Sequence, residues 1–97
     1  MDQRLHVIAR VVPRPEHLGD AREAIRAIVD QTRAEPGCLE FRVNEDVTDG
    51  SLHLYEEWAD AAALSQHHEQ PYTRYVFARY EEWLAEPIRL TRLTPVA

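Results

Sequence analysis

The order in which strand-like and helical patterns follow one another constrains the fold of this chain more than any other feature. Residues 5–12, 39–47, 52–58 and 88–93 have the composition or alternation of strands, whereas residues 15–34, 60–67 and 71–84 show helical periodicity. This β-α-β-β-α-β order predicts an α+β fold of the ferredoxin-like kind, a four-stranded antiparallel sheet with the helices on one face. The 97 residues fit a single domain, which we expect to span residues 1–97.

A hairpin is predicted between the second and third strands, because Asp49-Gly50 is a strong turn signal. A loop of two or four residues predicts the same register, in which Phe41 faces Trp58 and Val43 faces Glu56. The same register pairs Val47 with Leu52, Arg42 with Glu57, Asn44 with Tyr55 and Asp46 with His53. The opposite charges that it brings together across the strands favour this register.

The sheet face without helices is predicted to be too apolar to remain in water. Ile8 and Val12 lie on that face beside His6 and Arg10, and the third strand adds Tyr55. Packing two such sheets against each other covers both faces, and a two-fold axis lets one surface serve both partners. We therefore expect a homodimer.

Composition and charge exclude several classes of protein. The net charge is −6, and the basic residues form no stripe that could neutralise a phosphate backbone, so we expect no nucleic-acid partner. No segment approaches the roughly 18 apolar residues of a membrane helix, and no signal-peptide pattern follows Met1, so we expect a cytoplasmic protein without membrane contact. The lone Cys38 is expected to pack as a small apolar residue.

Several local patterns occur together in family-like order and spacing. They are Glu35-Pro36-Gly37-Cys38-Leu39-Glu40-Phe41, Tyr55-Glu56-Glu57-Trp58, Ala63-Leu64-Ser65-Gln66-His67 and Pro71-Tyr72. On these stretches the chain resembles the antibiotic biosynthesis monooxygenase family. The resemblance implies a dimeric α/β barrel, in which two ferredoxin-like sheets pack face to face and each subunit keeps a pocket between sheet and helices.

The resemblance also implies an activity. Members of the family oxygenate phenols and quinols, including polyketide aromatics, without flavin or metal, and one branch degrades haem. A deprotonated quinol can itself pass an electron to molecular oxygen, provided that the protein binds the aromatic, removes its proton and excludes water. We therefore expect a small aromatic substrate and molecular oxygen as partners, and no cofactor.

Two residues are candidates for the catalytic base. Glu56 lies on the apolar face between Leu54 and Trp58, where burial should raise the pKa of its carboxyl; alternatively, it is a structural acid bound to a helix end or to Arg92. His67 occupies the histidine position of the family pattern, and imidazole suits general-base chemistry at neutral pH; alternatively, it pins the helix to the sheet. His68, about 100° away around the helix, is expected to face solvent.

Aromatic residues are the candidates for substrate binding. Phe41 and Trp58 would form a wall for a planar ligand, although aromatic residues at strand ends also serve as core. The helical run from Pro71 adds Tyr72, whose hydroxyl could hold a phenolic substrate, and Phe77. The predicted cavity therefore brings Phe41, Glu56, Trp58 and His67 together between the sheet and the helices.

Other functions are less well supported by the residues. The histidines show no metal-ligand spacing, and no glycine-rich phosphate loop is present. The haem-degrading branch uses an asparagine, a tryptophan and a histidine where this chain has Ala9, His67 and Phe77. The leading hypothesis is a cofactor-independent monooxygenase acting on a quinol, polyphenol or polyketide-type aromatic, and the alternative is a non-catalytic, dimeric ligand-binding or stress-related protein of the same fold.

Overall fold

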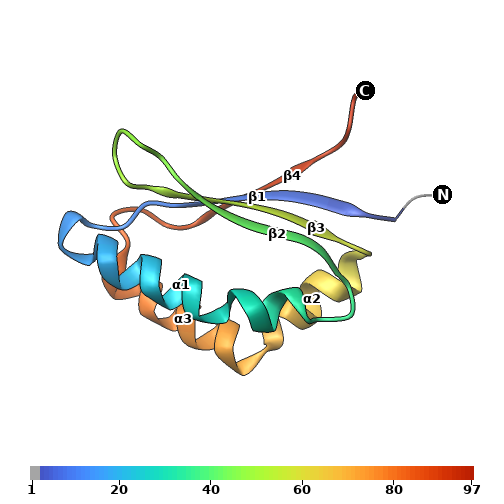
Figure 1. Ribbon diagram of the computed structural model, residues 1–97, viewed down its shortest axis with the longest axis horizontal. Coiled ribbons are helices and arrows are strands. Elements are labelled where there is room, and N and C mark those ends of the chain that lie inside the picture. The colour runs from blue at the N-terminus through green and yellow to red at the C-terminus, as the bar shows by residue number, and fades with distance from the viewer. Residues whose placement is uncertain (1–2) are drawn as a thin grey trace.

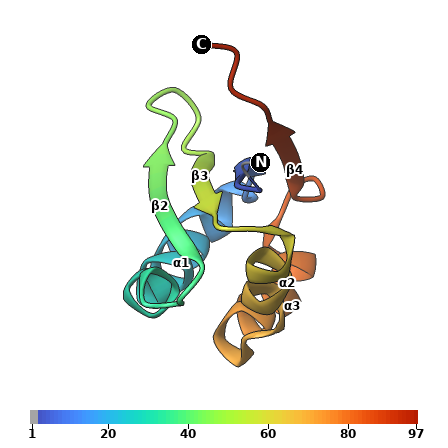
Figure 2. The ribbon, with the colours of Figure 1, turned by 90° about the vertical axis from the view of Figure 1, so that its right-hand side faces the viewer.

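Four antiparallel strands form one sheet in the order β2-β3-β1-β4, and three α-helices cover one of its faces (Figure 1, Figure 2). The computed structural model describes residues 3–97. The elements are β1 (Leu5–Val11), a 3-10 turn η1 (Pro15–His17), α1 (Leu18–Arg33), β2 (Cys38–Glu45), β3 (Leu52–Trp58), α2 (Ala61–Glu69), α3 (Pro71–Trp83) and β4 (Arg89–Leu93). The predicted ferredoxin-like α+β fold is confirmed.

Short-range signals set the ends of the helices. The Asp60 carboxylate accepts a hydrogen bond from the backbone N–H of Ala63 at 2.8 Å and so caps α2, as its position predicted. Pro71 starts α3, where the absent N–H of proline costs nothing. Pro15 begins the 3-10 turn rather than the α-helix, so α1 starts three residues later than predicted. None of the helices within residues 3–97 is long and apolar enough to cross a membrane.

The core lies between the helices and the two central strands. Alternate residues of each strand point to the helices because side chains alternate across a pleated sheet. The buried apolar residues of the two central strands, β1 and β3, are Val7, Ala9, Val11, Leu52, Leu54 and Trp58, and those of α1 are Ala21, Ile25 and Ile28. Burial of these apolar side chains is the main favourable contribution to the stability of the single sheet layer.

The predicted hairpin register is wrong by two residues. Phe41 pairs with Glu56 and Val43 with Leu54, while on the other face Arg42 pairs with Tyr55 and Asn44 with His53. Leu52 pairs with Glu45 instead of Val47, and Glu57 pairs with Glu40 instead of Arg42. Asp46 and Val47 both lie beyond the end of β2.

The cause of the shift lies in the hairpin loop. Asp46 and Ser51 close a four-residue loop, with the Asp46 N–H donating to the Ser51 carbonyl at 2.8 Å and the Gly50 N–H donating to the Asp46 carbonyl at 2.9 Å. The carboxylates of Asp46 and Asp49 accept the backbone N–H groups of Thr48 and Ser51, which favours a loop of residues 47–50 over the predicted loops of residues 49–50 or 48–51. A two-residue shift keeps each side chain on its predicted face.

On its second face, the sheet carries no helix from residues 3–97. Ile8 and Tyr55 lie on this face, as predicted, and pair directly with each other; both side chains are half-buried in the single chain. The Tyr55 hydroxyl donates to Glu57 at 3.0 Å and lies 3.3 Å from Nδ1 of His6. These polar contacts fix the Tyr55 ring on a surface that no other element of the described residues covers (Figure 2).

Candidate functional site

Glu56 is a buried carboxylate at the centre of the helix-covered sheet face. It lies on β3 between Leu54 and Trp58, and only 5% of the residue is exposed. The indole N–H of Trp58 donates to its Oε1 atom at 3.0 Å. Its hydrogen bond thus comes from the neighbouring indole, and neither Arg92 nor a helix end provides the partner that the structural alternative required.

Burial raises the pKa of the Glu56 carboxyl to about 7. The Trp58 hydrogen bond lowers it, while the negative charge of Glu35 raises it further. At neutral pH the carboxyl is therefore near the midpoint of its titration, which is the condition under which one group both accepts and releases a proton.

His67 is buried on α2 and directed into the protein. It is 4% exposed, and its ring packs against the rings of Trp58 and Phe41, with centroids 4.7 Å and 5.9 Å away. Its Nδ1 atom lies 2.9 Å from Oε2 of Glu35. Within the described residues, the His67 ring forms a hydrogen bond only through Nδ1, so its Nε2 atom remains available to a ligand.

Glu35 was not singled out as a site residue from the sequence, although it begins the first family-like stretch. Its Oε2 atom accepts from Tyr72 Oη at 2.5 Å as well as contacting His67, and its side chain is 9% exposed. Burial and the Glu35 hydrogen bond raise the pKa of Tyr72, which keeps the phenol protonated and acting as a donor. The signal that could have found Glu35 was an acid placed directly before the Pro36-Gly37 turn.

A close approach between two backbone segments places Glu35 against His67. A Cβ atom on Gly37 would lie 2.2 Å from the Cβ of Ala63, so only glycine lets α2 pack so near the turn after α1. The Ala59 N–H also donates to the Gly37 carbonyl at 2.9 Å. These contacts fix the start of α2 relative to the end of α1, and with it the carboxylate–imidazole pair.

An inner cavity of about 30 Å³ lies between the sheet and the helices. Phe41, Glu56 and His67 all line it, together with Thr73 and Phe77 of α3. Trp58 and Tyr72 do not line it: Trp58 supports Glu56 and His67 from behind, and Tyr72 binds Glu35. The candidate residues therefore lie close together, with Phe41, Glu56, His67 and Phe77 at the cavity wall and Trp58 and Tyr72 behind them.

His68 differs from its predicted position. It is half-buried and lines the inner cavity, with its ring centroid 5.5 Å from that of Phe77. The helix that follows covers it, because α3 turns back against α2 immediately after Gln70. Burial lowers the pKa of His68, and the neighbouring His67 lowers it further.

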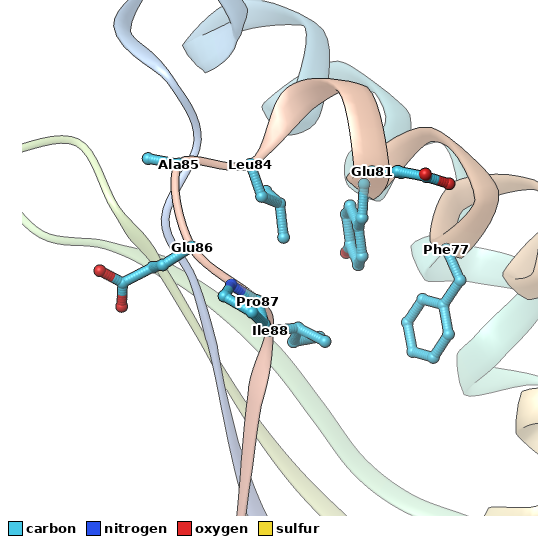
Figure 3. Close-up of a pocket in the computed structure, with 8 residues that line it drawn as sticks. Phe77, Glu81, Leu84, Ala85, Glu86, Pro87 and Ile88 are labelled. Carbon is cyan, nitrogen blue, oxygen red and sulfur yellow. The ribbon is translucent and has the colours of Figure 1, made fainter.

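A larger pocket of about 420 Å³ adjoins the inner cavity at the end of α3 (Figure 3). Phe77, Tyr80 and Ile88 line both spaces. The outer pocket is completed by Glu81, Leu84, Ala85, Glu86 and Pro87. Its volume falls in the range of small-molecule sites, whereas the inner cavity has room for about one water-sized group.

Burial within the site favours the neutral forms of its titratable groups. Burial, with the charges of Glu35 and Glu56, raises the pKa of the Cys38 thiol to about 11, so it remains a thiol. Burial and Glu56 likewise raise the pKa of Tyr80. Among residues 3–97, no three His, Cys, Asp or Glu side chains are grouped so that they could hold a metal ion.

Comparison with known proteins places this architecture in a family. The antibiotic biosynthesis monooxygenase family matches residues 4–79. The Mycobacterium tuberculosis protein named "Putative monooxygenase Rv0793" is 37% identical over 100 residues, which cover 99% of this chain and 95% of that protein.

Solved structures agree with the sequence match. The Rv0793 structure superposes with a TM-score of 0.90 at 33% identity, covering 97% of this chain and 96% of that one. PA3566 from Pseudomonas aeruginosa superposes with a TM-score of 0.89 at 29% identity, covering 100% and 98% of the two chains. The chain therefore belongs to the antibiotic biosynthesis monooxygenase family.

Proposed function

We propose that this protein is a cofactor-independent monooxygenase that oxidises a quinol, a polyphenol or a polyketide-type aromatic. The observation that carries the proposal is the meeting of the buried Glu56 carboxyl, with its pKa of about 7, and the His67–Glu35 pair beside one apolar cavity. Both side chains can accept the proton of a bound phenol. The monooxygenase in the printed name of the Rv0793 protein supports the same reaction class.

Removal of a phenolic proton is the step that these residues would assist. Nδ1 of His67 is engaged by Glu35, so Nε2 would receive the proton, and the Glu35 carboxylate would stabilise the imidazolium that results. The phenolate then passes one electron to molecular oxygen. For a hydroquinone, one O₂ is consumed and one hydroxyquinone and one water are formed, so the substrate supplies all the electrons.

The surroundings of the two bases suit a radical intermediate. Phe41, Leu54 and Val76 line the inner cavity and are buried, which limits the access of water to the reacting pair. Trp58 and Tyr72 act on the bases through hydrogen bonds and packing, so we propose them as positioning residues, and Phe77 and Phe41 as the aromatic walls toward the substrate.

We further propose that the working form is a homodimer joined through the uncovered sheet face. Ile8 and Tyr55 lie paired at its centre, and no part of residues 3–97 covers them. An obligate interface of this kind typically buries about 2,000 Å² or more.

Haem degradation is disfavoured by the side chains at the corresponding positions. Ala9 and Phe77 both line the inner cavity, and neither carries an atom that binds iron or donates a hydrogen bond. The same positions suit an apolar aromatic ligand.

Oxygen uptake by the purified protein tests the proposal. We expect consumption of O₂ with members of a hydroquinone panel after exhaustive chelation and without added flavin or nicotinamide. Boiled protein with each hydroquinone measures the background of autoxidation.

Two results would contradict the proposal. Loss of uptake after chelation, restored by a metal, would show that the substrate alone does not activate oxygen. Binding of the aromatics without any uptake would instead support the non-catalytic ligand-binding alternative.

A further inference from the structure

Two buried threonines of this chain differ in how their hydroxyls are satisfied. Thr32, in the last turn of α1, donates to the Ile28 carbonyl four residues earlier at 2.8 Å. Thr73 is only 2% exposed, yet its hydroxyl has no hydrogen-bond partner among the described residues. Buried polar groups are normally paired, so an unpaired one points to a partner from outside the chain, such as a water or a ligand.

The position of Thr73 in α3 explains why the protein does not satisfy it. It is the third residue of the helix, and four residues earlier lies Glu69, which belongs to α2. The carbonyl three residues earlier, that of Gln70, accepts the Arg74 N–H at 2.9 Å. The first turn of a helix offers a threonine no free carbonyl of its own helix.

Thr73 also lines the inner cavity, together with the carboxyl group of Glu56 and the imidazole of His67. At about 30 Å³ the cavity is far smaller than the roughly 150 Å³ of a cavity that binds benzene. It can hold one oxygen-sized group beside Thr73, Glu56 and His67, but no aromatic ring.

An aromatic ring of a ligand fits instead in the outer pocket, which adjoins the inner cavity. The outer pocket of about 420 Å³ shares Phe77, Tyr80 and Ile88 with the inner cavity, and Figure 3 shows Phe77 and Ile88 at its edge. Thr73 and Phe77 lie one turn apart on α3, an axial rise of about 6 Å. A ring held near Phe77 therefore has one substituent at the level of Thr73.

We propose that Thr73 is a specificity-determining residue whose hydroxyl hydrogen-bonds the oxygen substituent of an aromatic ligand, while the ring of that ligand occupies the outer pocket. The inference rests on the proposed function for its ligand class, an aromatic that carries a hydroxyl or carbonyl oxygen. A hydroxyl both donates and accepts, so it can hold this oxygen in the quinol and in the quinone.

Anaerobic binding titrations test the proposal without any turnover. The probes are 1,4-dihydroxynaphthalene and naphthalene, which share the ring and differ in the oxygens. Wild-type protein should bind the dihydroxy compound more tightly. Thr73→Val, which keeps the shape, should weaken binding of the dihydroxy compound about tenfold, leave naphthalene unchanged and raise the Tm of the free protein.

Two further variants serve as controls. Thr73→Ser retains the hydroxyl and should bind the dihydroxy compound within about threefold of wild type. Thr32→Val removes the satisfied hydroxyl, so it should lower the Tm and leave both affinities unchanged.

Unchanged affinity of Thr73→Val for both probes would overturn the proposal, and so would an equal loss for both, which indicates a packing defect. Equal binding of the two probes by wild type would overturn it as well. Oxygen uptake is recorded separately: a wild type that consumes no oxygen, while Thr73→Val weakens binding of the dihydroxy compound alone, refutes the monooxygenase and leaves Thr73 as the ligand anchor.

Discussion

The Nδ1 atom of His67 lies 2.9 Å from the Oε2 atom of Glu35, although 32 residues separate them in the chain. The same carboxylate oxygen accepts the Tyr72 hydroxyl, so α2, α3 and the turn after α1 meet at one atom. An imidazole held at Nδ1 by a carboxylate has a fixed orientation and a stabilised protonated form, which is the arrangement a general base requires.

Replacing His67 tests its role as the base. We expect His67→Ala to reduce turnover of an accepted quinol by roughly 10²- to 10⁴-fold, the usual contribution of general acid–base catalysis. His17→Ala is the matched control, because His17 pairs with Asp20 near the start of α1 and does not line the inner cavity. A folded His67→Ala protein with unchanged turnover would leave Glu56 as the base to be tested.

Glu35→Gln tests whether the carboxylate acts through His67. The variant keeps the shape of Glu35 and removes the charge that stabilises the imidazolium, so we expect a smaller loss of turnover than in His67→Ala. In the double variant, Glu35→Gln should reduce turnover hardly further than His67→Ala alone, because the effects of residues that act as a unit are not additive. Additive losses in the double variant would assign Glu35 a separate role.

The pKa of Glu56 predicts a dependence of stability on pH. The carboxyl has a pKa of about 7 in the folded protein against 4.5 as its ordinary value, so the folded state binds the proton more tightly. Stability should therefore fall as the pH rises from about 4.5 to about 7, by on the order of 3 kcal/mol.

Chemical denaturation of Glu56→Gln at several pH values measures this effect. Relative to wild type, the variant should gain stability as the pH rises from 5 to 8, because glutamine carries no titrating group. Glu69→Gln, at an exposed acid of α2, should show no such trend. A constant difference between wild type and Glu56→Gln would show that the carboxyl does not titrate in this range.

The contact between Gly37 and Ala63 predicts a steric effect. Gly37→Ala should destabilise the protein by roughly 1–3 kcal/mol, because the new methyl group would lie 2.2 Å from the Ala63 Cβ. Adding Ala63→Gly should restore part of the loss by making room. Gly19→Ala, in α1 with nothing within 4 Å, should instead be neutral or stabilising by up to about 1 kcal/mol. Equal effects at both glycines in thermal melts would contradict the packing argument.

The uncovered sheet face predicts a dimer that one charge can disrupt. Ile8→Arg places a cation where two sheets would pack, so we expect the variant to be a monomer at micromolar concentration by light scattering, and we expect wild type to be a dimer under the same conditions. Tyr75→Arg, on an exposed site of α3, should leave the dimer intact. A wild-type monomer, or a dimer that survives Ile8→Arg, would place the interface elsewhere.

Local patterns were sufficient to predict the elements and their faces. The period of two in the strands placed Glu56, Phe41 and Trp58 toward the helices, and Asp60 and Pro71 marked the starts of α2 and α3. The predicted hairpin register was wrong because several neighbouring loop closures compete within a few residues. Hydrogen bonds within the loop backbone and to the Asp46 side chain favour the closure between Asp46 and Ser51.

By itself, then, the sequence determined the ferredoxin-like order, the two faces of the sheet and the burial of Glu56, since each follows from periodicity and turn residues within a short window. Only the tertiary structure decided that Glu35 binds His67, that His68 is covered and that the Thr73 hydroxyl lacks a partner within residues 3–97. These relationships depend on how closely α1, α2 and α3 approach one another. That distance is set by packing between residues far apart in the chain, which no local pattern records.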